Sequence, residues 1–231
     1  IFAPFFGGAS AQTFSDQQRG DIDSLIREYI LTHPEVIAES MDRWRKRREA
    51  DRDQRQRQSL NSLGAQVYEN PMTPISGAAK GTHDLVIVEF FDYQCSYCKK
   101  AFPTVLKLLE TDKKLRIAWK EFPILGPASR IAALAAMAAK KQGKYFEFHV
   151  ALMSLKGRLS EQRIMKTAQK IGLDIARLTQ DMNDPAISAY IEETLALGQS
   201  LGISGTPAFI IGEHVIPGAI GEDQMRQLIK I

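Results

Sequence analysis

Cys95 and Cys98 are the two cysteines of this 231-residue chain, and Ser96 and Tyr97 separate them. Two thiols at this spacing can close a small disulfide, bind a soft metal ion, or exchange electrons with another disulfide. The sequence contains no second cysteine pair, so a disulfide framework and a four-cysteine zinc site are both excluded. The two sulfurs must therefore act together in whatever chemistry they perform.

The pair lies where a buried strand should end and a helix should begin. Residues 85–91 are an almost continuous apolar and β-branched run, and residues 102–110 have a helical pattern. Cys95 would then sit at a helix N-terminus, where free N–H groups and the helix dipole lower a thiol pKa below its usual value of about 8.5. Cys98 would face inward about one turn along. We expect Cys95 to attack a substrate disulfide and Cys98 to resolve the mixed disulfide.

Two metal sites and an inert structural disulfide compete with this redox interpretation. A structural zinc site needs four ligands, and the four histidines show no ligand spacing relative to the cysteines. A two-thiolate Cu(I) site at Cys95 and Cys98 is the better metal alternative, because soft thiolates bind that ion well. We favour the redox pair because it follows a strand in an α/β unit.

Composition and charge are those of an ordinary globular protein. Hydrophobic residues make up 44% and charged residues 25% of the chain, and no apolar run approaches the roughly 20 residues that span a bilayer. The net charge of +3 is too small to indicate nucleic acid, and its excess is local, since residues 42–58 hold eight Lys/Arg and four Asp/Glu. We interpret this run as a solvated face. Nucleic-acid binding is less favoured because bases stack on aromatic side chains, and Trp44 is the only aromatic residue near this run.

The N-terminus predicts export. Residues 1–11 are largely apolar and reach the small-residue pattern Ala9-Ser10-Ala11, which fits a signal-peptidase site. We interpret them as a signal-peptide remnant, with Gln12 as the mature start; a hydrophobic strand is the alternative. Export places the cysteines in an oxidising compartment, where disulfide chemistry is routine.

Residues 12–44 predict two amphipathic helices. The first follows a capping box at Ser15 and Gln18, and the second has a similar box at Thr32 and Glu35. The apolar residues of the first helix share one stripe: Ile22, Leu25, Ile26, Tyr29 and Ile30. Residues 45–63 predict a charged helical linker. Because the stripe covers only the first half of this segment, it must dock on the main domain or on copies of itself, and we favour self-association.

The compact domain is expected over residues 64–231. A turn-rich lead-in at 64–84 precedes strands at 85–91 and 115–120, a helical block at 129–197, two strands at 207–211 and 214–217, and a helix at 222–230. This order predicts an α/β sheet that carries a helical insertion at about residues 128–200.

A second motif, Gly205-Thr206-Pro207 before a strand, makes the chain resemble the thioredoxin-fold disulfide oxidoreductases of the bacterial DsbA family. The resemblance spans about residues 64–231 and rests on five motifs: Glu89-Phe90-Phe91, Cys95-Ser96-Tyr97-Cys98, residues 122–126, residues 142–145 and Thr206-Pro207. It implies a thioredoxin fold with an inserted helical domain, and a redox-active Cys95–Cys98 disulfide in place of any cofactor.

The resemblance also implies roles around the cysteines. Pro207 would be cis and lie against the disulfide, and the backbone at Thr206 would be free to pair with a substrate strand. Ser96, Tyr97 and Gly205 become candidate substrate contacts.

Glu89 would lie beneath the cysteines and move protons as the second thiol titrates. A carboxylate in an apolar strand is costly unless it is neutral or paired, so its pKa should be raised. A salt bridge with Lys120 is the alternative.

Two positions depart from the strongly oxidising DsbA pattern, which has Pro-His between the cysteines and Val before the proline. Ser96-Tyr97 and Thr206 occupy those places here. Without a positive charge from histidine beside the thiolate, the pair should be less oxidising. Tyr in the motif and Thr before the proline are similar to the DsbC-type isomerases. The N-terminal helical extension is similar to that of the ScsC (suppressor of copper sensitivity) proteins, some of which are trimers with isomerase activity.

Together these features predict a periplasmic thiol-disulfide oxidoreductase that acts as a disulfide isomerase or reductase on misfolded secreted proteins. We expect a homo-oligomer, with a trimer favoured, that a membrane thiol reductase keeps reduced. Nucleic-acid binding and a membrane span in the mature chain are not expected. A monomeric DsbA-type dithiol oxidase and a Cu(I)-binding protein of copper tolerance are the alternatives.

Overall fold

The computed structural model describes residues 14–229, and the expected signal-peptide remnant lies outside them. The chain divides into two compact units, one ending at Asp53 and the other beginning at Gln54. No helix in the described part of the chain is long and apolar enough to cross a membrane.

The first unit contains helix α1 (Asp16–Thr32) and the beginning of helix α2 (Pro34–Tyr68). The capping box at Ser15 and Gln18 is confirmed: the Gln18 amide donates to the Ser15 hydroxyl oxygen, and the Gln18 side chain accepts from the Ser15 amide. The second box is wrong. Thr32 is the last residue of α1, and its hydroxyl donates to the Glu28 carbonyl at 2.8 Å. A single residue separates α1 from α2, so Thr32 belongs to the first helix and does not cap the second.

The apolar stripe of the first unit is open to solvent in the single chain. Its side chains range from 36% exposed at Ile22 to 66% at Leu25, and Trp44 in α2 is 54% exposed. Arg48 lies over the Trp44 ring, 5.3 Å from its centroid. A helical stripe of this size is unusual on a monomer.

The second unit is built on a five-stranded sheet of order β1-β3-β2-β4-β5. Its strands are β1 (Ile75–Gly77), β2 (Leu85–Phe91), β3 (Leu115–Glu121), β4 (Ala208–Ile211) and β5 (His214–Pro217). β2 and β3 run parallel and the other neighbours run antiparallel. The sequence did not predict β1, a three-residue edge strand within the turn-rich lead-in.

Alternation along β2 separates the two faces of the sheet. Ile87 and Phe91 belong to the larger apolar cluster, which also holds both cysteines and helix α3 (Ser96–Thr111). Val88 and Phe90 belong to a smaller cluster on the opposite face. Glu89, between them, shares the face of Ile87 and Phe91 and therefore points toward the cysteine side.

The end of α2 covers the smaller cluster. Leu60 and Val67 are buried there against residues of β2, β4 and helix α8. Residues 64–68, expected to be turn-rich, are therefore helical up to Tyr68. Burial of Val67 accompanies this last turn, and the turn residues Asn70 and Pro71 follow the helix end.

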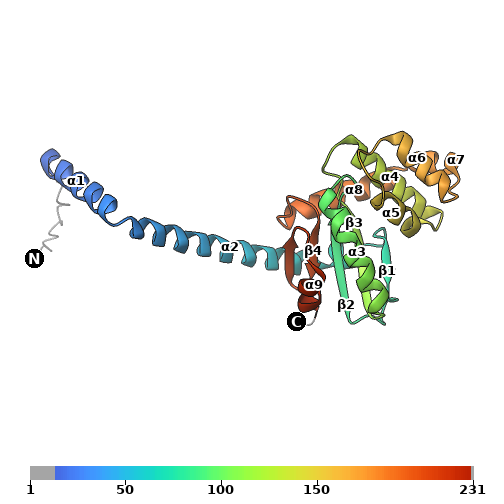
Figure 1. Ribbon diagram of the computed structural model, residues 1–231, viewed down its shortest axis with the longest axis horizontal. Helices are drawn as coiled ribbons and strands as arrows, with labels where there is room; N and C mark the ends of the chain where they lie inside the picture. Colours follow the sequence, from blue (N-terminus) through green and yellow to red (C-terminus); the bar gives the residue numbers. More distant parts are fainter. Residues whose placement is uncertain (1–13, 230–231) are drawn as a thin grey trace, which may run out of the picture. The chain divides into compact units, whose positions relative to one another are not determined.

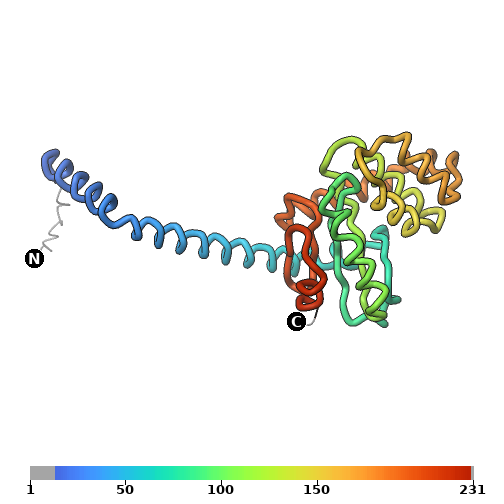
Figure 2. The backbone as a smooth tube through the Cα atoms, in the orientation of Figure 1, coloured from blue at the N-terminus to red at the C-terminus, as the bar shows by residue number. Residues whose placement is uncertain are grey.

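Helices α4 (Pro127–Lys141), α5 (Tyr145–Met153), α6 (Glu161–Lys170), α7 (Ile175–Asp181) and α8 (Pro185–Ser200) form the predicted helical insertion. Figure 1 shows them gathered at the end of the sheet where α3 begins. The chain then returns to the sheet as β4 and β5 and closes with α9 (Glu222–Ile229), as the trace in Figure 2 shows. The α/β sheet with a helical insertion is thus confirmed.

Candidate active site

Cys95 is the N-cap residue of α3, with extended backbone geometry. Its sulfur accepts a hydrogen bond from the Cys98 amide at 3.4 Å. Its own amide donates to the Asp92 carbonyl at 3.0 Å, which folds the four residues after β2 into a tight turn. The strand end and the helix start therefore hold this sulfur at the position that the sequence predicted.

The pKa of Cys95 is lowered to about 5. The main cause is a hydrogen bond from the Cys98 side chain, with smaller contributions from the Thr206 side chain and the amides of Cys98 and Tyr97; partial burial opposes them. A thiol with this pKa is almost entirely thiolate at neutral pH, so Cys95 has the reactivity of a nucleophile.

Cys98 differs from Cys95 in its acidity. Its side chain is fully buried, and its pKa is raised because of this burial, the hydrogen bond to Cys95 and the nearby charge of Glu89. Both cysteines are free thiols in this structure. Cys95, which is 6% exposed, is therefore largely ionised, whereas the fully buried Cys98 holds its proton.

The Thr206–Pro207 peptide bond is cis, as the resemblance implied, and Pro207 is buried. The Cys95 sulfur lies 3.1 Å from the Thr206 carbonyl oxygen, to which its thiol form donates. Gly205, Ser96 and Tyr97 are exposed around the two sulfurs. The Tyr97 side chain is 63% exposed, so an incoming peptide can contact it.

Glu89 is fully buried, and neither carboxyl oxygen has a hydrogen-bond partner among residues 14–229. Burial, with a smaller contribution from the charge of Cys95, raises its pKa to about 8. The alternative of a salt bridge with Lys120 is wrong. Lys120 points to the other face of the sheet, where its ammonium donates to the Gln66 carbonyl and the Thr73 hydroxyl, each at 2.8 Å.

A second cluster of buried polar side chains surrounds Glu121, and it was not predicted from the sequence. Glu121 accepts hydrogen bonds from Tyr93 at 3.0 Å and Tyr145 at 2.8 Å, and His149 lies 3.0 Å from the Tyr93 hydroxyl. Burial raises the pKa of Glu121 to about 8 and lowers that of His149 to about 3. Both groups are therefore mostly neutral at pH 7.

Asp92 ties this region to the insertion. Its carboxylate accepts from the Gln94 amide at 2.7 Å, the Ser129 hydroxyl at 2.7 Å and the Leu125 amide at 2.9 Å. The turn that carries Cys95 is thereby bound to the loop before α4 and to α4 itself.

Comparison with known proteins places this geometry in a family. Residues 86–230 match the DsbA-like thioredoxin domain. The chain belongs to that family of thiol-disulfide oxidoreductases, whose members use redox-active cysteines. Residues 18–51 also match the N-terminal domain of the copper resistance protein ScsC.

Solved structures extend the comparison. A thioredoxin-like oxidoreductase from Silicibacter pomeroyi is 38% identical, with a TM-score of 0.69 over 72% of this chain and 95% of its own. A linker-deletion variant of Proteus mirabilis ScsC is 26% identical, with a TM-score of 0.70 over 96% of this chain and 97% of its own. The second comparison includes the N-terminal helices.

Among curated proteins, the Na⁺/H⁺ antiporter NhaA 1 of Salinispora arenicola is 30% identical over 145 residues. This match takes in 61% of the chain and 22% of that relative. The chain thus spans about a fifth of the length of this much longer protein.

Proposed function

We propose that this DsbA-family chain is a periplasmic disulfide isomerase and reductase that acts on misfolded exported proteins. The main support for this proposal is the difference in acidity between the two thiols: Cys95 has a pKa of about 5, whereas Cys98 keeps its proton. Such a pair can wait in the reduced form with one sulfur ready to attack. Isomerisation requires this form, because a reduced sulfur must begin the exchange.

The reaction begins when the Cys95 thiolate attacks one sulfur of a substrate disulfide. The substrate S–S bond breaks, a Cys95–substrate disulfide forms, and the other substrate sulfur leaves as a thiolate that takes up a proton from water. In isomerisation, a different substrate thiolate attacks the mixed disulfide and Cys95 leaves as thiolate, with no net oxidation. In reduction, the Cys98 thiol loses its proton and its sulfur attacks Cys95. The Cys95–Cys98 disulfide forms, and the substrate departs reduced by two electrons.

Glu89 is the base that we assign to the second step. The Cys95 charge raises the pKa of Glu89, so loss of that charge in the mixed disulfide favours ionisation of the carboxyl group. An ionised Glu89 without a hydrogen-bond partner can then accept the Cys98 proton. Glu89 thus becomes able to accept a proton once Cys95 is part of the mixed disulfide.

Thr206 and Pro207 are proposed to receive the substrate backbone beside the sulfurs, with Ser96, Tyr97 and Gly205 as further contacts. Tyr97 and Thr206 replace the residues of the strongly oxidising pattern, and no imidazolium stands between the cysteines. This composition supports isomerase and reductase activity over dithiol oxidation.

The N-terminal segment is proposed to assemble copies of the chain, and we favour a trimer. Its exposed stripe and the match of residues 18–51 to the ScsC N-terminal domain support assembly. Several catalytic domains in one particle would keep an unfolded substrate at high effective concentration during exchange. A membrane thiol reductase would restore the reduced form after each Cys95–Cys98 disulfide.

The Cu(I)-binding alternative has weaker support. A two-thiolate site needs both sulfurs deprotonated, and burial raises the pKa of Cys98. Stoichiometric, tight retention of Cu(I) without any reduction of a model disulfide would favour this alternative.

The Cys98→Ala variant tests the proposed activity. An isomerase should still restore a protein with scrambled disulfides, because a substrate thiol can resolve the mixed disulfide, whereas an oxidase needs both cysteines. Recovery of activity of the scrambled substrate is measured for the wild type, Cys98→Ala and Cys95→Ala. Activity in the first two alone supports the proposal. Loss in Cys98→Ala with rapid oxidation of a dithiol peptide by the wild type would contradict it.

A further inference from the structure

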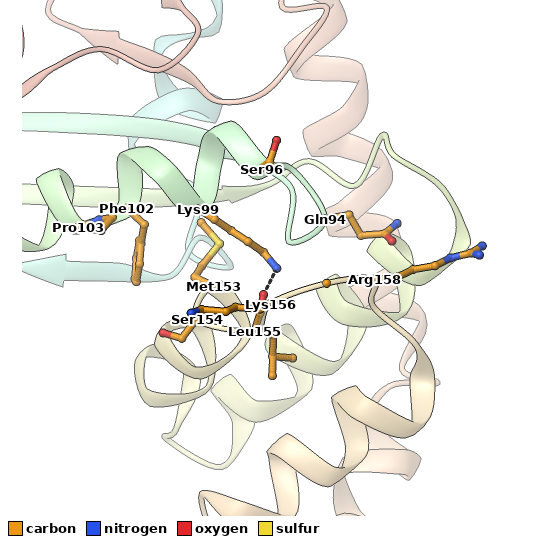
Figure 3. Close-up of a pocket in the computed structure, with 11 residues that line it drawn as sticks. Gln94, Ser96, Lys99, Phe102, Pro103, Met153, Ser154, Leu155, Lys156 and Arg158 are labelled. Carbon is orange, nitrogen blue, oxygen red and sulfur yellow. Dashed lines mark hydrogen bonds between the residues drawn. The ribbon is translucent and has the colours of Figure 1, made fainter.

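A cavity of about 660 Å³ opens beside the active site, between helix α3 and the loop that joins α5 to α6. Ser96, Lys99 and Phe102 line it from α3, and Met153 and Leu155 line it from the insertion (Figure 3). Phe102 and Met153 are almost fully buried, so the cavity has an apolar floor. It begins one residue from Cys95 and lies within a single compact unit.

The rim of this cavity is positively charged. Lys99, Lys156 and Arg158 line it, and none of its lining residues, all of which the structure describes, is acidic. Lys99 donates to the Leu155 carbonyl at 2.5 Å, as the dashed line in Figure 3 shows. Partial burial of Lys99 and the nearby Arg163 lower the pKa of Lys99. Cations that line one cavity without an acidic partner among its lining residues favour an anion there.

We propose that this cavity is a substrate subsite that binds an acidic side chain together with a neighbouring apolar side chain of the peptide being exchanged. The inference rests on the proposed function, since the peptide is held by its sulfur at Cys95. An extended chain advances about 3.3 Å per residue. Residues a few positions from the substrate cysteine can therefore reach the cavity while the mixed disulfide exists. The apolar side chain would contact the floor, and the carboxylate would lie at the rim.

Two peptides test the subsite with the full-length protein. Each has one cysteine in a disulfide with 2-mercaptoethanol and is flanked on both sides by Glu-Phe in one peptide and by Lys-Phe in the other. The rate constant for reaction with reduced protein is measured, with hydroxyethyl disulfide as an uncharged reference. We expect the wild type to react about tenfold faster with the acidic peptide. This preference should shrink at about 0.5 M NaCl, because salt screens the rim charges.

A double variant, Lys156→Glu with Arg158→Glu, should abolish the preference for the acidic peptide. A second double variant, Lys113→Glu with Lys166→Glu, is the control: it makes the same change in net charge at exposed positions outside the cavity. This control should keep the preference.

The outcomes separate two kinds of failure. If the wild type does not react with hydroxyethyl disulfide, the proposed function fails. If that reaction proceeds but both peptides react equally, or if the preference survives in the Lys156→Glu and Arg158→Glu variant, the subsite is refuted while the proposed function stands.

Discussion

Hydrogen bonds to the Cys95 sulfur determine which of the two cysteines can attack. The Cys98 side chain makes the largest contribution to the low pKa of Cys95, and the surrounding amides add to it. The helix N-terminus alone would favour any anion at this position. The inner cysteine therefore has two tasks, since it stabilises the thiolate before it resolves the mixed disulfide.

The contribution of Cys98 can be measured with two variants. Cys98→Ser keeps a hydrogen-bond donor beside Cys95, whereas Cys98→Ala removes it. In the serine variant, we expect the alkylation rate of Cys95 to fall as the pH is lowered, with a midpoint near pH 5. In the alanine variant the midpoint should be about one pH unit higher. Iodoacetamide kinetics across pH 3–9 provide the measurement. Equal midpoints would show that the helix and its amides act alone.

Glu89 should make the stability of the protein depend on pH. Burial raises its pKa from 4.5 to about 8 in the folded state. The folded protein therefore holds this proton more tightly than the unfolded chain. The corresponding stabilisation is fully present below about pH 4.5 and is lost as the pH rises through about 8. Glu89→Gln, which stays neutral, should not show this loss.

The expected difference is large enough for denaturant unfolding. Relative to Glu89→Gln, the wild type should lose roughly 2–4 kcal/mol between pH 5 and pH 8. The variant retains Glu121, whose pKa is also about 8, so that residue contributes equally to both proteins. Parallel stability curves for the two proteins would mean that Glu89 is solvated or paired in solution.

At the scale of elements, local patterns predicted what lies close in sequence. β2 was predicted at its observed bounds because its apolar run is continuous, and the placement of Cys95 followed from it. β1 was missed because its pairing with β3 joins Ile75 to Ala118, far along the chain. The helical residues 64–68 were missed for the same reason, since burial of Val67 against the sheet decides their structure.

The candidate site shows the same limit. Cys95 and Cys98 form a short motif that the sequence shows directly, whereas Glu89 and the cis proline were expected from the resemblance to the DsbA family. Glu121 and His149 are connected through Tyr93 and Tyr145, and no local pattern links residues from a turn, a strand end and an insertion helix. The motif at residues 142–145 was the one sequence signal for this group, because the hydroxyl of its Tyr145 donates a hydrogen bond to Glu121.

The end of α2 depends on a buried lysine, which gives an element-scale prediction. Lys120 donates to the Gln66 carbonyl in the last turn of α2 and to Thr73. Lys120→Met keeps the apolar stem but removes the ammonium donor from the Gln66 carbonyl and leaves the buried Thr73 hydroxyl with Tyr190 as its side-chain partner. We expect a loss of about 1–3 kcal/mol in the free energy of unfolding, measured with denaturant. Lys114→Met, which removes an exposed salt bridge with Asp84, is the control and should change stability little. Similar losses in both would argue against the buried contacts.

At the scale of the whole molecule, the exposed apolar stripe allows self-association to be tested with the full-length protein. Leu25→Asp together with Ile26→Asp places two charges in the stripe. We expect light scattering to report a monomer for this variant and an oligomer for the wild type, because charges in an apolar helical interface are costly. Recovery of scrambled substrates should fall, while reduction of a small disulfide should be unchanged. Gln17→Asp, on the opposite side of α1, is the control. A wild-type monomer with full isomerase activity would contradict the role of assembly.

The two tryptophans occupy separate units: Trp44 is 54% exposed in the first, and Trp119 is fully buried in the second. A solvated indole fluoresces at longer wavelength than one enclosed by apolar side chains and the His149 ring, whose centroid lies 4.5 Å away. The emission spectrum of the unlabelled protein therefore contains two separable signals. A soluble collisional quencher such as iodide would reach the N-terminal one first, so assembly and unfolding can be followed by light without introducing a dye or a new cysteine.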